Sequence, residues 1–145
     1  MFTNILCPVD FSEDSERALA AALALARSTG AHVTIVTVVD PLLSAGAAAA
    51  GADEALDGQT QQELRSLLDR AAPGLPASSA AAVAVRVGDP AKEILLQAEE
   101  CNADIIVMGM RGVGAAQKFM LGSTSEHVLR RSTVPVLVVP PPSRR

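Results

Sequence analysis

The sequence predicts a single α/β domain built on a five-stranded parallel sheet with helices on both faces. Its 145 residues are the length of one ordinary domain, and 49% of them are hydrophobic, which is enough for a core. Five short apolar runs alternate along the chain with segments of helical periodicity. Parallel strands joined by right-handed helical crossovers are the common solution for that order, so we expect a doubly wound fold.

The first strand and the first helix are predicted close together. A short, mostly apolar run at 3–9 is typical of a buried strand. A helix follows at once, and its first turn is capped either by Asp10, with Glu13 three residues later as in a capping box, or by Ser12. Apolar residues then recur at helical spacing, and Gly30 supplies the stop.

The middle of the chain is less regular. Residues 32–39 are β-branched almost throughout, which favours a central strand buried on both faces, and Asp40-Pro41 ends it. Residues 42–52 are rich in Ala and Gly and show no useful periodicity, so we expect a flexible loop there. Leucines at helical spacing predict a second helix over 53–72.

The second half of the chain continues the alternation. Valines alternate with other residues over 81–87, which predicts an edge strand, and Pro90 suits the first turn of the helix that follows. A continuous apolar strand is expected over 104–109. A last helix should begin near Gly122-Ser123, and a fifth strand is expected over 135–139.

One domain is expected over 1–145, with a disordered tail at 140–145.

Composition excludes several classes of protein. Three Phe and no Tyr or Trp argue against base-stacking nucleic-acid readers, and a net charge of -4 argues against a general polyanion partner. Cys7 and Cys101 lie far apart and predict two reduced thiols. Neither a membrane span nor a signal peptide is evident, so we expect a cytoplasmic protein with no membrane partner.

The last third of the chain combines positive charge, glycines and hydroxyl groups. Residues 105–145 have a formal charge of +5, against -9 for 1–104. Gly109-Met110-Arg111-Gly112 follows the predicted fourth strand, and Gly122-Ser123-Thr124-Ser125 opens the last helix. Such residues beyond a parallel strand and at a helix start can cradle a phosphate. The pattern is neither a Walker A loop nor a dinucleotide fingerprint, and a plain turn with an ordinary helix cap stays open.

The sequence resembles the ATP-binding universal stress proteins. The pattern Gly-x2-Gly-x9-Gly-Ser, from Gly109 to Ser123, is typical of that family, and three other stretches and the final strand agree with it. These are Ile5-Leu6-Cys7-Pro8-Val9-Asp10, Gly88-Asp89-Pro90, Ala103-Asp104-Ile105-Ile106-Val107-Met108-Gly109 and Pro135-Val136-Leu137-Val138-Val139. The resemblance covers essentially the whole chain outside the predicted loop.

The resemblance implies a strand order, a ligand and a set of contacts. The order is 3-2-1-4-5, and ATP lies across the carboxyl ends of strands one and four, often with a divalent cation such as Mg or Mn. Contacts on the adenosine side are implied for Pro8, Val9, Asp10 and Val39. Contacts with the ribose and phosphates are implied for Met108, Gly109, Gly112, Gly122, Ser123 and Thr124. Arg111 and Ser125 join this set because a guanidinium and a hydroxyl bind phosphate oxygens. Many nucleotide-binding members have Thr in place of Val9, so one hydroxyl contact is missing here.

Dimerisation and catalysis are the remaining expectations. The family usually dimerises through its last strand, and Val136–Val139, apolar on both faces, would be an aggregation hazard as a bare edge. No pair of side chains indicates catalysis, and His32 and His127 are expected to be structural or solvated. The sequence therefore favours a homodimeric, ATP-binding stress-response protein with at most slow hydrolysis and an unidentified protein partner. The alternatives are an interaction module that binds no nucleotide, and a true ATPase or phosphotransferase.

Overall fold

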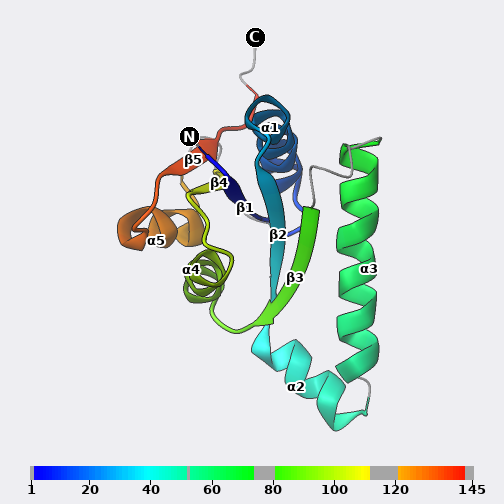
Figure 1. The fold of residues 1–145 in the computed structure, drawn as a ribbon. Helices are drawn as coiled ribbons and strands as arrows, with labels where there is room; N and C mark the ends of the chain where they lie inside the picture. Colours follow the sequence, from blue (N-terminus) through cyan, green and yellow to red (C-terminus); the bar gives the residue numbers. More distant parts are fainter. Residues whose placement is uncertain (1, 52, 74–80, 112–120, 143–145) are drawn as a thin grey trace.

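Five strands and five helices make up the computed structural model, which describes residues 2–51, 53–73, 81–111 and 121–142 (Figure 1). The strands are β1 (Asn4–Pro8), β2 (His32–Val39), β3 (Ala81–Val87), β4 (Ile105–Gly109) and β5 (Val136–Val139). The helices are α1 (Glu13–Thr29), α2 (Pro41–Ala49), α3 (Asp53–Ala71), α4 (Pro90–Glu100) and α5 (Ser123–Arg131). The element order confirms the predicted alternation, with one additional helix.

The strands form one sheet in the order β3-β2-β1-β4-β5, and every neighbouring pair is parallel. Leu6, in the middle of β1, is in register with Thr34 of β2 on one side and with Ile106 of β4 on the other. The chain thus winds outward from β1 in one direction and from β4 in the other. Ligands of open α/β sheets bind at this reversal, beyond the carboxyl ends of the strands.

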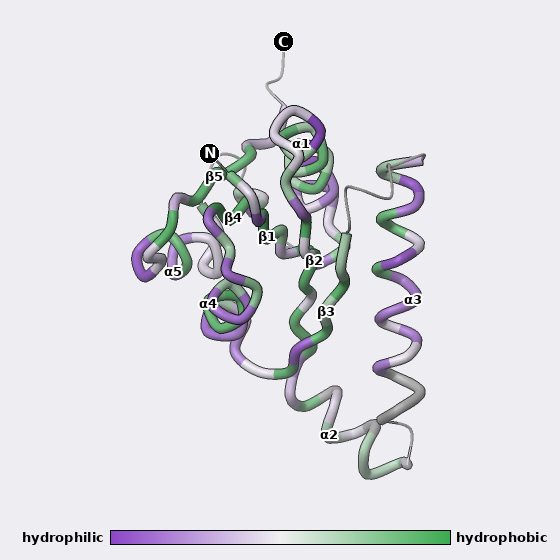
Figure 2. The backbone as a smooth tube through the Cα atoms, in the orientation of Figure 1, coloured by the Kyte–Doolittle hydropathy of each residue, from purple (hydrophilic) through white to green (hydrophobic). Residues whose placement is uncertain are grey.

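Alternation along the central strands divides the core between the two faces of the sheet. Ile5 and Cys7 of β1 belong to a buried cluster with α1 and α3, whereas Leu6 between them belongs to a second cluster with α4 and α5. In β4, Val107 and Ile106 divide in the same way. Strands that bury both faces need an unbroken apolar sequence, which explains the runs of hydrophobic residues. Figure 2 shows the central strands mostly in green and α3 in alternating purple and green.

The start and the stop of α1 follow from local chemistry. Ser12 is the N-cap, and its side chain accepts a hydrogen bond from the amide of Ser15. Asp10 accepts from the Ser12 amide instead, so the second of the two predicted caps is the correct one. Gly30 ends the helix at φ 74°, a left-handed conformation that glycine adopts without steric cost.

The prediction of a flexible loop over 42–52 is wrong for most of its length, because Pro41–Ala49 form α2. Asp40 caps this helix by accepting a hydrogen bond from the Leu42 amide at 2.7 Å, and Pro41 occupies the first turn. Alanine has the highest helix propensity, so a run of it continues a capped helix even without an amphipathic period. Figure 1 shows α2 beyond the ends of β2 and β3, leading into α3.

The two cysteines are unpaired, as the sequence predicts, whereas the disordered tail expected over 140–145 stays a prediction. Residues 140–142 have no regular structure, and 143–145 of the predicted tail lie outside the described residues. Cys7 and Cys101 are free thiols, and burial raises the pKa of Cys7 to about 12, so its thiol is inert at neutral pH. Within the described part of the chain, none of the helices is long and apolar enough to cross a membrane.

Candidate functional site

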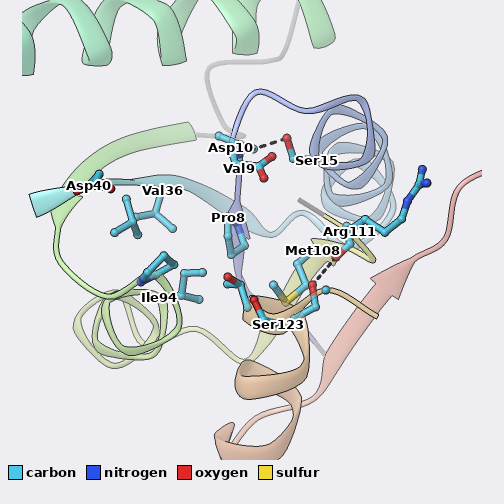
Figure 3. Close-up of a pocket in the computed structure, with 16 residues that line it drawn as sticks. Pro8, Val9, Asp10, Ser15, Val36, Asp40, Ile94, Met108, Arg111 and Ser123 are labelled. Atoms are coloured by element: carbon cyan, nitrogen blue, oxygen red, sulfur yellow. Dashed lines mark hydrogen bonds between the residues drawn. The ribbon is translucent and has the colours of Figure 1, made fainter. Parts of the chain in front are cut away.

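A cavity of about 690 Å³ opens at the carboxyl ends of β1 and β4, where the strand order reverses (Figure 3). Its volume lies within the range of small-molecule sites in proteins. The lining comes from three strands, from α4 and from the starts of α1 and α5. It consists of Pro8, Val9, Asp10, Ser15, Val36, Val38, Asp40, Pro90, Ile94, Met108, Gly109, Arg111, Gly122, Ser123, Thr124 and Ser125.

One side of the cavity is an apolar wall, made of Pro8, Val36, Val38, Pro90, Ile94 and Met108. Val36, Val38, Ile94 and Met108 extend the core cluster that packs under α4 and α5. Figure 3 shows Val36 and Ile94 on one side of Pro8, with Met108 and Ser123 on the other. A flat apolar group, such as a heteroaromatic ring, would be desolvated favourably between these side chains.

The other side of the cavity is the N-terminus of α5. Gly122 is the N-cap, and no side chain in the described part of the chain caps this helix. The first amides of a helix have no intrahelical acceptor, and their dipoles point outward, so they favour an anion. Ser123 and Thr124 add two hydroxyl groups to this uncapped turn. The wall and the helix start together offer a surface that is apolar at one end and anion-binding at the other.

The turn between β1 and α1 borders the cavity and is held in a strained conformation. Phe11 has φ 62°, which is uncommon for a bulky residue, and the residue is 39% exposed. The carboxylate of Asp10 holds the turn by accepting from the Ser12 amide at 3.1 Å, and the Asp10 amide donates to Ser15 Oγ at 3.3 Å. Backbone strain of this kind is frequent at binding sites.

The end of β4 is fixed by contacts from α5. Ser125 is buried, and its hydroxyl donates to the carbonyl oxygen of Gly109 at 2.8 Å. The Gly122 amide donates to the carbonyl oxygen of Met110 at 2.7 Å. The first turn of α5 is therefore tied to the end of β4, and the Ser125 hydroxyl bonds the main chain in this structure.

A buried carboxylate lies next to the contact between the end of β4 and the first turn of α5. Asp14 is 4% exposed and accepts hydrogen bonds from Arg111, which follows β4, and from Arg17, one turn later on α1. The hydrogen bonds from the Arg111 side chain hold the pKa of Asp14 below its usual range, against the opposing effect of burial. In Figure 3 the Arg111 side chain runs away from the cavity. Because its guanidinium pairs with Asp14, the described lining has no unpaired cation.

The structure brings ten of the twelve predicted site residues to this cavity. Gly112 lies outside the described residues, and Val39 is not part of the lining; its carbonyl oxygen accepts from the Gly88 amide at 3.3 Å. The contacts of these residues with a ligand stay a prediction. Sequence reasoning missed Ser15, Val36, Val38, Pro90 and Ile94 in the lining, and Asp14 beside it.

The described residues supply no ready-made metal cage and no evident catalytic pair. No group of three or more His, Cys, Asp or Glu in this part of the chain is placed to hold a metal ion. His32 and His127 are exposed and do not line the cavity.

Comparisons with known proteins place the chain in a family. The model of the universal stress protein family matches residues 1–140. The universal stress protein YxiE of Bacillus subtilis is 32% identical, over 96% of this chain and 99% of its own length. A universal stress protein of Thermus aquaticus is 34% identical over 96% of this chain and 99% of its own length.

Solved structures agree with these relatives. The protein MJ0577, of Methanocaldococcus jannaschii, superimposes with a TM-score of 0.80 at 29% identity, covering 99% of each chain. A universal stress protein in complex with cAMP superimposes with a TM-score of 0.68 at 27% identity, covering 95% of this chain and 96% of its own. The sheet order, the extent of the match and the sequence identity lead to one conclusion: this chain belongs to the universal stress protein family.

Proposed function

We propose that this protein binds ATP in the cavity between β1 and β4 and acts as a nucleotide-dependent regulatory homodimer in the cytoplasm, with at most slow hydrolysis. The observation that supports this most strongly is the pairing of the apolar wall with the uncapped start of α5 across one cavity. The wall suits a nucleobase, and the amides suit phosphates. A relative crystallised with cAMP adds support for a nucleotide.

The negative charge of the phosphates has to be balanced mainly by the dipoles at the start of α5 and by a bound cation. Arg111 is the only Lys or Arg in the described lining, and its guanidinium pairs with the carboxylate of Asp14. Mg²⁺ commonly binds through substrate phosphates with one or two protein carboxylates, and Asp10 is a carboxylate of the lining. We therefore propose that Mg²⁺ or Mn²⁺ enters with ATP and is held chiefly by the phosphates.

The proposed dimer uses the β5 edge of the sheet. This strand pairs with β4 on one side, and Leu137 in it is 43% exposed. On the adjoining α5, Leu129 is 40% exposed. A two-fold partner that covers this edge would bury both leucines and pair the open strand, giving an isologous interface.

Calorimetric titration with ATP and Mg²⁺ tests the proposal. We expect saturable binding of one nucleotide per chain, which Ser123→Glu weakens by about tenfold or more through repulsion of the phosphates. A glutamate in the first turn of α5 is favoured by the helix dipole, so this variant should fold as well as the parent.

Gln62→Glu is the matched control, since it makes the same charge change at an exposed position of α3. It should leave ATP binding unchanged. Absence of heat from the parent protein at millimolar ATP would reject the proposed function. Equal affinities of the parent and Ser123→Glu would place the phosphates elsewhere.

A further inference from the structure

The carboxylate of Asp14 connects two segments that are 97 residues apart. Its Oδ2 atom accepts from the main-chain amide of Arg111 at 3.1 Å and from Nε of the same residue at 3.0 Å. Its Oδ1 atom accepts from Nη2 at 3.0 Å. Two parallel bonds to a guanidinium fix its orientation, and the third fixes the main chain as well. Asp14 therefore holds Arg111 by both its backbone and its side chain.

The main chain that Asp14 holds is part of the cavity. A Cβ atom on Gly109, two residues before Arg111, would lie 2.9 Å from the main-chain carbon and oxygen of Asp14, so α1 touches the end of β4 directly. On the other side, Ser125 and Gly122 bond the main chain at Gly109 and Met110. Asp14 thus fixes one side of the segment from Gly109 to Arg111, and the first turn of α5 is bonded to the other side.

We propose that Asp14 is a positioning residue for nucleotide binding. It keeps the guanidinium of Arg111 paired and turned away from the cavity, and it sets the main chain from Gly109 to Arg111 on which the start of α5 rests. This inference rests on the proposed function. The opposing possibility is that Arg111 leaves Asp14 and binds the phosphates through its charge.

The two possible roles of Arg111 predict changes in ATP affinity of opposite sign for Asp14→Asn. If Asp14 positions the segment, Asp14→Asn and Arg111→Gln each weaken ATP and adenosine by the same factor, about tenfold, because both disturb the same geometry. The double variant binds no worse than either single one, since the pair acts as a unit. If Arg111 binds phosphate, Arg111→Gln weakens ATP much more than adenosine, and Asp14→Asn strengthens ATP by releasing the guanidinium.

Two further variants separate geometry from charge. Arg17→Gln is the control, because Arg17 also pairs with Asp14 but lies on the same helix, so this pair does not connect α1 to β4. It should leave both affinities unchanged. Arg111→Lys keeps the charge but cannot form the bidentate pair with Asp14, so under the proposal it binds ATP no better than Arg111→Gln. Recovery of ATP affinity by lysine would overturn the proposal.

The experiment is a set of calorimetric titrations of the full chain with ATP and with adenosine, with the thermal midpoint measured for each variant. Equal losses of affinity for ATP and adenosine in the two single variants, together with no further loss in the double variant, support the positioning role. Opposite signs for Asp14→Asn and Arg111→Gln reject it while leaving the proposed function intact. If the parent protein binds neither ligand, the proposed function fails and the positioning role fails with it.

Discussion

Gly109 and Asp14 approach so closely that a side chain at position 109 has no room. A Cβ atom there would lie 2.9 Å from the main-chain carbon and oxygen of Asp14 and 3.0 Å from its Cβ. The first turn of α1 therefore packs directly on the carboxyl end of β4. This contact brings the buried carboxylate of Asp14 within reach of Arg111, and it places the start of α1 at the edge of the cavity.

We expect Gly109→Ala to destabilise the protein by about 1–3 kcal/mol, the usual cost of forcing extra atoms into a packed site. Gly58→Ala is the matched control, because Gly58 lies in α3 and a Cβ atom added there would point into open space. Alanine there should stabilise the protein by roughly 0.5–1 kcal/mol through helix propensity. Urea unfolding measures both changes, and equal effects at the two positions would contradict the close contact.

Gly122→Val should retain the fold and lose nucleotide binding. Gly122 has φ -67° and ψ 157°, a conformation open to any residue, so valine adds no backbone strain. Its side chain would occupy space next to the first amides of α5, and we expect ATP affinity to fall by at least about tenfold.

Gly30→Val should show the reverse pattern. Gly30 ends α1 at φ 74°, away from the cavity lining, so a side chain there costs roughly 1–2 kcal/mol of stability. ATP affinity should stay unchanged. Thermal midpoints and titrations of both variants check the pair, and an intact ATP affinity in Gly122→Val would show that the phosphates do not approach this turn.

The Asp14–Arg111 pair predicts that part of the folding stability is lost at acid pH. The pKa of Asp14 is lowered in the folded state, chiefly by hydrogen bonds from Arg111, so the unfolded chain binds a proton more readily. The stability that the pair contributes is present in full above the unfolded pKa of about 4, and it is lost as the pH falls further.

Asp14→Asn lacks this contribution at every pH. The difference in unfolding free energy between parent and variant should therefore be largest near pH 6 and shrink below about pH 4. Urea unfolding between pH 3 and pH 6 measures it. A difference that stays constant over this range would mean that Asp14 is not ionised and paired in the folded protein.

Leu137→Asp should convert the proposed dimer to a folded monomer. Leu137 on β5 is 43% exposed, so a carboxylate there is tolerated in the monomer but not in a paired, desolvated edge. Leu42→Asp is the control, since Leu42 is 82% exposed on α2. Light scattering should give a dimer for the parent and for Leu42→Asp. A dimeric Leu137→Asp would exclude β5 as the interface.

The fold was predictable because its strong signals are local. The apolar runs predict β2 and β3 with their observed ends, and Gly30 stops α1 where expected. The same logic should have found α2, because Asp40-Pro41 caps it much as Asp89-Pro90 begins α4. Without an amphipathic period, the alanine run beyond Asp40 resembles a loop, and the capping signal is easily interpreted only as the end of a strand.

The candidate site was predictable only where a motif marks it. Residues at the ends of β1 and β4 are found from their position after strands, whereas Val36 and Ile94 carry no signal beyond being hydrophobic. Asp14 was missed because its partner lies 97 residues away and is brought near by the strand order. The prediction that Arg111 faces a phosphate could not anticipate this competing carboxylate.

Nitrogen-15 NMR of the main-chain amides during an ATP titration tests the central claim most directly. The account predicts that the amide signals of Ser123 and Thr124, in the uncapped first turn of α5, shift furthest and saturate together with the calorimetric binding curve. Binding that leaves these two amides unshifted, with the largest changes elsewhere in the chain, would contradict it.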